Sequence, residues 1–122
     1  LPNETDGASQ PRVLPLPYGV GDMSERMGQP LDLAKLKQIH FYVGVGANDI
    51  NVNDVPREFD VYVGRTRVER AQRFCQALKA VGVDASLTIF PNVGHQVTNE
   101  MRAGAIKFLK QTVLGVKSQL KP

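Results

Sequence analysis

The sequence predicts an α/β fold in which two parallel strands lie between helices. Apolar, β-prone runs occupy residues 39–45 and 85–90, and apolar residues recur at helical spacing over 66–81 and 98–113. Strands that alternate with helices are typical of a parallel sheet with a right-handed crossover. Because two strands alone make a poor sheet, we expect them to belong to a larger sheet supplied by sequence outside this chain.

The first elements are predicted from one proline and from apolar runs. Pro30 suits a helix start, and the apolar residues after it predict a short helix over 31–37. The run at 39–45 is nearly all apolar rather than alternating, which indicates a buried strand. Residues 47–64 are rich in Asn and Asp, and we expect them to form a long loop.

The later elements have clearer ends. The helix over 66–81 is the most strongly patterned, and Gly82 is a natural terminator after it. Polar and apolar residues alternate in the strand at 85–90, which predicts one wetter face, as near a sheet edge. Thr98 is placed to cap the last helix, which we expect to end near residue 113.

These elements divide the chain into three segments. Residues 1–30 are rich in Pro, Gly and polar residues, and we expect an irregular arm there. Residues 31–115 hold the predicted βαβα unit with its preceding short helix. Residues 116–122 are expected to be a frayed tail.

Composition argues against several classes of function. The formal net charge is +3, the basic residues are mixed with acidic ones, and no dense basic run indicates nucleic-acid binding. We expect no membrane span and recognise no signal peptide, so the compartment stays unassigned. The single cysteine, Cys75, excludes an intrachain disulfide and a multi-cysteine metal site. Its place on the apolar face of a helix predicts a core residue.

The candidate chemistry lies where the two predicted strands end. Asp49 lies three residues beyond Gly46, and His95 directly follows Gly94. In a parallel sheet both loops leave the same edge, and adjacent strands are about 4.8 Å apart, so a carboxylate can meet an imidazole there. Asp49 would accept a bond from one ring N–H, fix the tautomer and stabilise the imidazolium that forms when His95 takes a proton.

The same residues have plainer interpretations. One makes His95 a polar loop residue and Asp49 a turn former, since Asp is common in turns. Asp54 and Asp60 are rival carboxylates in the same long loop. His40 opens the first strand at the end opposite the candidate site, and we expect it to be structural.

A nucleophile, the third member of a hydrolase triad, is missing from these 122 residues. There is no G-x-S-x-G pattern, and no serine has the strand–turn–helix setting of a nucleophile elbow; the serines are Ser9, Ser24, Ser86 and Ser118. Asp49, Asp54 and His95 lack any recognised metal-ligand spacing. We therefore predict neither a metal nor a cofactor.

Four segments together resemble the carboxyl-terminal part of an α/β-hydrolase. They are Tyr-Val-Gly-Val-Gly-Ala-Asn-Asp at 42–49, the helix opening at 67–71, residues 78–85, and Phe-Pro-Asn-Val-Gly-His at 90–95. The resemblance covers about residues 36–112 and is closest to bacterial esterases and polyhydroxyalkanoate-depolymerase-like hydrolases. It implies a partial α/β-hydrolase fold: the last two parallel strands with flanking helices, a three-layer αβα fragment.

The resemblance also implies roles for the candidate residues. Asp49 matches the triad acid after the penultimate strand, and His95 matches the triad base after the last strand. Since the family order is Ser, Asp, His, the serine and the oxyanion-hole amides are expected before Leu1. The implied function is the carboxyl-terminal portion of a serine hydrolase acting on small-molecule esters or polyesters. The remainder of the hydrolase domain, or another chain, would cover the sheet edge; the alternative is a non-catalytic α/β interaction module or a degenerate hydrolase fragment.

Overall fold

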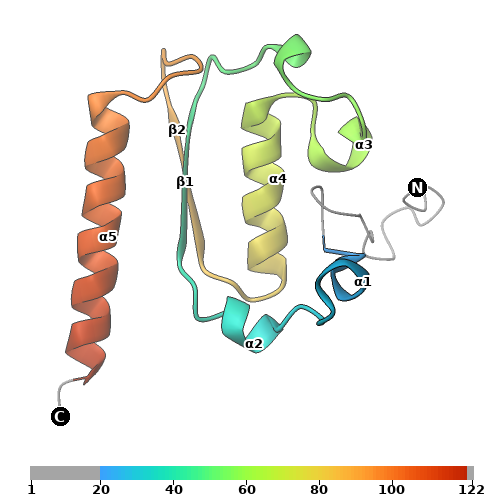
Figure 1. Cartoon of the computed structure of the whole chain (residues 1–122). Coiled ribbons are helices and arrows are strands. Elements are labelled where there is room, and N and C mark those ends of the chain that lie inside the picture. The colour runs from blue at the N-terminus through green and yellow to red at the C-terminus, as the bar shows by residue number, and fades with distance from the viewer. Residues whose placement is uncertain (1–19, 121–122) are drawn as a thin grey trace.

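The computed structural model describes residues 20–120, with side chains described as far as Gly115. Two parallel strands lie between helices, with α4 on one face of the sheet and α5 on the other (Figure 1). The elements in chain order are α1 (Met23–Met27), α2 (Leu33–Leu36), β1 (Phe41–Gly46), a 3₁₀ helix η2 (Val52–Asp54), α3 (Asp60–Val63), α4 (Arg67–Ala80), β2 (Ala85–Phe90) and α5 (Asn99–Leu120). The predicted α/β class and the predicted parallel pairing are confirmed.

The two strands pair along their whole lengths. Phe41 lies opposite Ala85 at one end, and Gly46 lies opposite Phe90 at the other. In this register both carboxyl ends lie at one edge of the molecule, where the loops toward η2 and α5 begin (Figure 1).

The main core lies between α4 and the sheet. Thr66 starts this helix, because its hydroxyl accepts a hydrogen bond from the Glu69 amide at 3.1 Å. The buried cluster combines two residues of α4 with one residue before β2 and the first residue of β2: Cys75, Leu78, Val83 and Ala85. Cys75 is 3% exposed, so its predicted place in the core is confirmed.

The opposite face of the sheet packs on α5 through aromatic rings and glycine. The rings of Tyr42 and Phe108 stack with their centroids 5.4 Å apart. A Cβ atom at Gly104 would lie 2.7 Å from the Tyr42 hydroxyl, so only glycine lets the helix approach this closely. These two contacts fix the position of α5 along β1 and its distance from the strand.

The structure departs from the predicted elements, most clearly at the start of β1, in the loop at 47–64 and at the end of α5; the short helix predicted over 31–37 is confined to Leu33–Leu36. The strand starts at Phe41 rather than 39, because the Gln38 and Ile39 amides close a turn onto α2. The loop at 47–64 contains two short helices, η2 and α3. The last helix runs through Gly115 to Leu120, where a helix end near 113 and a frayed tail were expected.

The predicted arm over residues 1–30 falls partly outside the described residues, which begin at residue 20. Its described part contains α1, which ends at Gly28 in a left-handed conformation with φ of 71°. In residues 20–120, no helix is long and apolar enough to cross a membrane.

Candidate functional site

The loops that follow β1 and β2 are tied together by backbone hydrogen bonds. The Ala47 amide donates to the Phe90 carbonyl and the Asn48 amide donates to the Val93 carbonyl, each at 2.8 Å. A Cβ atom at Gly46 would collide with the backbone carbonyl oxygens of this second loop. Glycine at this position therefore lets the two loops lie directly against each other.

Asp49 and His95 meet across these loops. The Nδ1 atom of His95 lies 2.8 Å from Oδ2 of Asp49, which is hydrogen-bond distance. The predicted meeting of the carboxylate and the imidazole is therefore confirmed. The two partners differ sharply in exposure: the Asp49 side chain is 6% exposed and the His95 side chain is 66% exposed.

Arg67, the first residue of α4, holds the other oxygen of the same carboxylate. Its Nη1 atom donates to Oδ1 of Asp49 at 3.1 Å. The same guanidinium also donates to the Asp54 backbone carbonyl at 3.2 Å and to the Asp54 carboxylate at 3.4 Å. One arginine thus joins the loop after β1, η2 and the start of α4.

These partners decide the charge of Asp49. Burial by itself raises the pKa of Asp49, but the hydrogen bonds from His95 and Arg67 and the charge of Arg67 outweigh it, so the pKa is lowered. The same contact, with Asp49 as the main cause, raises the pKa of Arg67. The buried acid is therefore a carboxylate at neutral pH.

The rival carboxylates are engaged elsewhere. Asp54 bonds to Arg67 and to Asn51, whose side-chain amide donates to it at 3.1 Å. Asp60 lies between two arginines, Arg57 and Arg70, each at 3.2 Å. Asp49 is the carboxylate that reaches His95.

A second Asp–His pair occupies the opposite end of the sheet. The Nδ1 atom of His40 lies 2.8 Å from Oδ2 of Asp84, just before the two strands begin. Both side chains are well exposed, at 42% for His40 and 60% for Asp84. His40 therefore lies at the strand start, at the end opposite the Asp49–His95 pair, as predicted.

Sequence reasoning missed the part played by Arg67. A signal for it exists, because a cation in the first turn of a helix faces the positive end of the helix dipole. An arginine there needs a nearby anion, and the preceding loop is rich in Asp. The identity of that anion depends on the path of the loop, which the sequence pattern does not specify.

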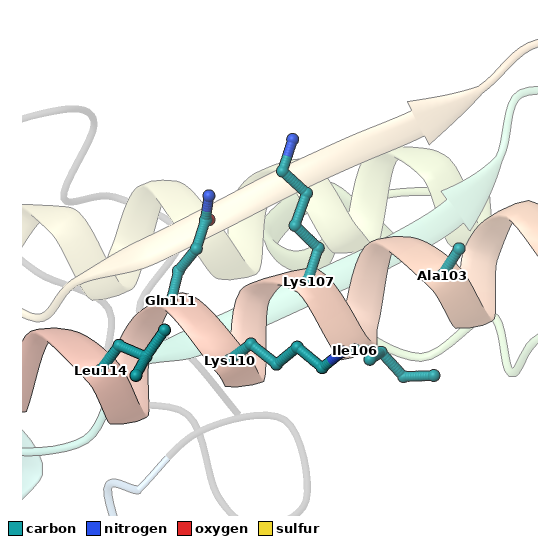
Figure 2. Close-up of a pocket in the computed structure, with 6 residues that line it drawn as sticks. All are labelled: Ala103, Ile106, Lys107, Lys110, Gln111 and Leu114. Carbon is teal, nitrogen blue, oxygen red and sulfur yellow. The ribbon is translucent and has the colours of Figure 1, made fainter.

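A shallow hollow lies away from this site, on the outer surface of α5. Figure 2 shows that its lining side chains all stand on that one helix; they are Ala103, Ile106, Lys107, Lys110, Gln111 and Leu114. It shares no residue with the Asp49–His95 pair, and a single helix cannot enclose a small molecule. We therefore assign the candidate chemistry to the loops rather than to this hollow.

Within residues 20–120, no group of three or more His, Cys, Asp or Glu side chains is placed to hold a metal ion. Burial raises the pKa of the Cys75 thiol, which disfavours the thiolate that a nucleophile or metal ligand needs. Comparison with protein families, curated proteins and solved structures gives no match to this chain.

Proposed function

We propose that this chain is the carboxyl-terminal portion of a serine hydrolase, with Asp49 as the triad acid and His95 as the triad base. One observation carries the proposal: a buried, ionised Asp49 bonds the imidazole of an exposed His95 at the carboxyl edge of a parallel sheet. Ligands of open parallel α/β sheets bind at this edge. The partial α/β-hydrolase fold, with a three-layer arrangement, belongs to the same proposal.

The hydrogen bond defines which ring nitrogen is the base. An ionised carboxylate only accepts hydrogen bonds, so the proton between the two residues belongs to Nδ1 of His95. In the neutral ring the lone pair then lies on Nε2. Nε2 of His95 has no hydrogen-bond partner among the described residues. This atom is available to take a proton from an incoming hydroxyl.

The proposed reaction follows the triad sequence of steps. A serine outside these 122 residues attacks the acyl carbonyl of an ester while His95 takes its proton. Asp49 stabilises the imidazolium, which then gives the proton to the departing alcohol. Water, activated by the same imidazole, hydrolyses the acyl-enzyme. The substrates proposed are small-molecule esters or polyesters.

The exposed surface of the chain supports a larger domain around it. In the described residues the sheet has two strands only, so each strand has one unpaired edge. α5 also exposes large apolar side chains, with exposed fractions between 50% and 61% for Ile106, Leu109, Val113 and Leu114. We propose that the remainder of the hydrolase domain, or another chain, covers the edge and these side chains.

The experiment compares the two histidines in the protein that contains this chain together with its serine. Hydrolysis of p-nitrophenyl esters is measured for wild type, His95→Ala and His40→Ala. We expect His95→Ala to lose at least about 10⁴-fold in kcat, because it removes the base. His40→Ala is the matched control, since it breaks an Asp–His pair of the same length at the other end of the sheet.

Two outcomes would contradict the proposal. One is near-normal hydrolysis by His95→Ala with the fold retained by circular dichroism. The other is an equal loss in both histidine variants, which would indicate a general effect on folding. Absence of hydrolysis in every variant, wild type included, favours the non-catalytic interaction module.

A further inference from the structure

We infer that Arg67 is a positioning residue of the Asp49–His95 pair: it orients the Asp49 carboxylate and keeps it ionised. The inference concerns the state of the pair itself, and only its consequence for turnover rests on the proposed function. The inference rests on one observation: Arg67 binds one oxygen of the Asp49 carboxylate and His95 binds the other.

These two hydrogen bonds, one to each oxygen, restrict the Asp49 carboxylate to one orientation. Arg67 donates to Oδ1 at 3.1 Å, so rotation of the carboxylate would break either that bond or the 2.8 Å bond at Oδ2. Since Asp49 is 6% exposed, water has little access to replace a lost partner. The plane of the carboxylate, and with it the direction of the His95 ring, is set from the start of α4.

Arg67 is also the cation that separates two neighbouring carboxylates. Asp49 and Asp54 both bond to its guanidinium, so the positive charge lies between two negative ones. The charged and titratable groups that contact Asp49 from the elements around it are Arg67 of α4 and His95 of the loop before α5; Asp54 of η2 contacts it through Arg67. The acid of the first turn of α4, Glu69, bonds instead to the Arg65 amide.

The planar fork of arginine suits this bridge better than an ammonium group. One guanidinium donates to two carboxylates and one backbone carbonyl at once, and its place at the start of a helix is otherwise unfavourable for a cation. Lysine at this position would keep the charge and lose most of the bridge. A comparison of Arg67→Lys with Arg67→Gln therefore separates the effect of the positive charge from the effect of orienting the Asp49 carboxylate.

The test titrates Asp49 directly in the full chain. Carboxyl ¹³C shifts of Asp49 and ring ¹⁵N shifts of His95 are followed against pH in wild type, Arg67→Gln, Arg67→Lys and Arg73→Gln. Arg73 is the matched control, because it lies on the same helix and bonds to the Val61 carbonyl instead of an acid.

We expect the Asp49 midpoint to move to higher pH in Arg67→Gln, to move in the same direction by less in Arg67→Lys, and to be unchanged in Arg73→Gln. In Arg67→Gln the ring ¹⁵N shifts at neutral pH should also lose the pattern of a single Nδ1–H tautomer. An unmoved Asp49 midpoint in folded Arg67→Gln would overturn the inference. If Arg67→Gln fails to fold, an Asp49 midpoint and ring ¹⁵N shifts in Arg67→Lys that both match wild type would overturn it.

The consequence for turnover is measured separately in the serine-containing protein. We expect Arg67→Gln to lower kcat by up to about 100-fold with little change in KM, because the base is misdirected rather than removed. An unchanged kcat alongside a shifted Asp49 midpoint would count against the proposed function and leave the inference about the pair intact. A large loss of kcat in Arg73→Gln would show that the assay reports folding, and it would overturn the proposed effect of Arg67 on turnover.

Discussion

Two Asp–His pairs stand at opposite ends of one small sheet, and their difference shows what makes a site. His95 with Asp49 and His40 with Asp84 each join Nδ1 to Oδ2 at 2.8 Å. Asp49 is 6% exposed and has Arg67 on its second oxygen, whereas Asp84 is 60% exposed. The distance between the partners is therefore uninformative, and burial of the acid with a second donor distinguishes the pairs.

The strand ends explain why the pairs differ. At the carboxyl edge, two loops are locked together by the Ala47 and Asn48 amides, and the long segment before α4 folds over Asp49 to bring Arg67 to it. At the other edge, the chain enters the strands from short turns, and among the described residues the Phe41 amide donates to the Asp84 carbonyl beside the pair. Parallel sheets concentrate their loops at the carboxyl edge in this way.

The largest expected effect separates the two carboxylates. In the serine-containing protein, Asp49→Asn should lower kcat by about 10⁴-fold, because an amide donates to the ring and selects the wrong tautomer. Asp84→Asn should leave kcat near wild type. Steady-state ester hydrolysis measures both variants, and similar kcat values for the two would remove the distinction between the ends of the sheet.

The next effect is on stability at the carboxyl edge. Gly46→Ala should lower the free energy of unfolding by about 3 kcal/mol, because its Cβ would collide with the facing carbonyls and force the loops apart. Gly94→Ala is the control, since nothing lies within 4 Å of a Cβ built there. Urea denaturation of each variant gives the values, and equal losses at both glycines would show that close contact of the loops is unimportant.

Acid should weaken the fold through Asp49. Its pKa is lower in the folded chain than the ordinary 3.8, so its stabilising contribution is complete above that value and is lost as pH falls through the folded pKa. In wild type the free energy of unfolding should therefore decline across this acidic window, and the decline should be shallower in Asp49→Asn. Denaturation at a series of pH values measures the slope; parallel slopes would contradict the assigned charge of Asp49.

The smallest effect is expected at the other pair. His40→Ala should change the free energy of unfolding by less than about 1 kcal/mol, because an ion pair between exposed side chains contributes little. The same denaturation assay tests it. A loss several times larger would mean that the His40–Asp84 pair organises the start of both strands.

The sequence predicted the elements whose ends carry local signals. The bounds of β2 match the prediction, and α4 begins after its Thr66 cap and ends close to Gly82. The predicted end of the last helix near residue 113 was wrong, because the helix continues through Gly115 to Leu120, and a glycine can continue a helix at some cost. α3 was missed because it follows Phe59 in a left-handed conformation, with φ of 62°, which no residue pattern indicates.

The meeting of Asp49 and His95 was predictable for a different reason. Topology brings a carboxylate from the first loop close to His95, because two parallel strands place the residues that follow them at one edge. The Arg67 contact does not follow from topology, because it requires a side chain from a helix to cross the loop that precedes it. Which of Asp49 and Asp54 bonds to His95 also depends on the path of that loop, which the sequence pattern does not specify.

The most direct test of the central claim is labelling with a fluorophosphonate probe of serine hydrolases. The probe is applied to the serine-containing protein as wild type, His95→Ala and His40→Ala, and the labelled residue is located by mass spectrometry. The account predicts one labelled serine in wild type and His40→Ala, and a far slower reaction in His95→Ala, whose serine lacks its base. Equal labelling rates in all three proteins would contradict it.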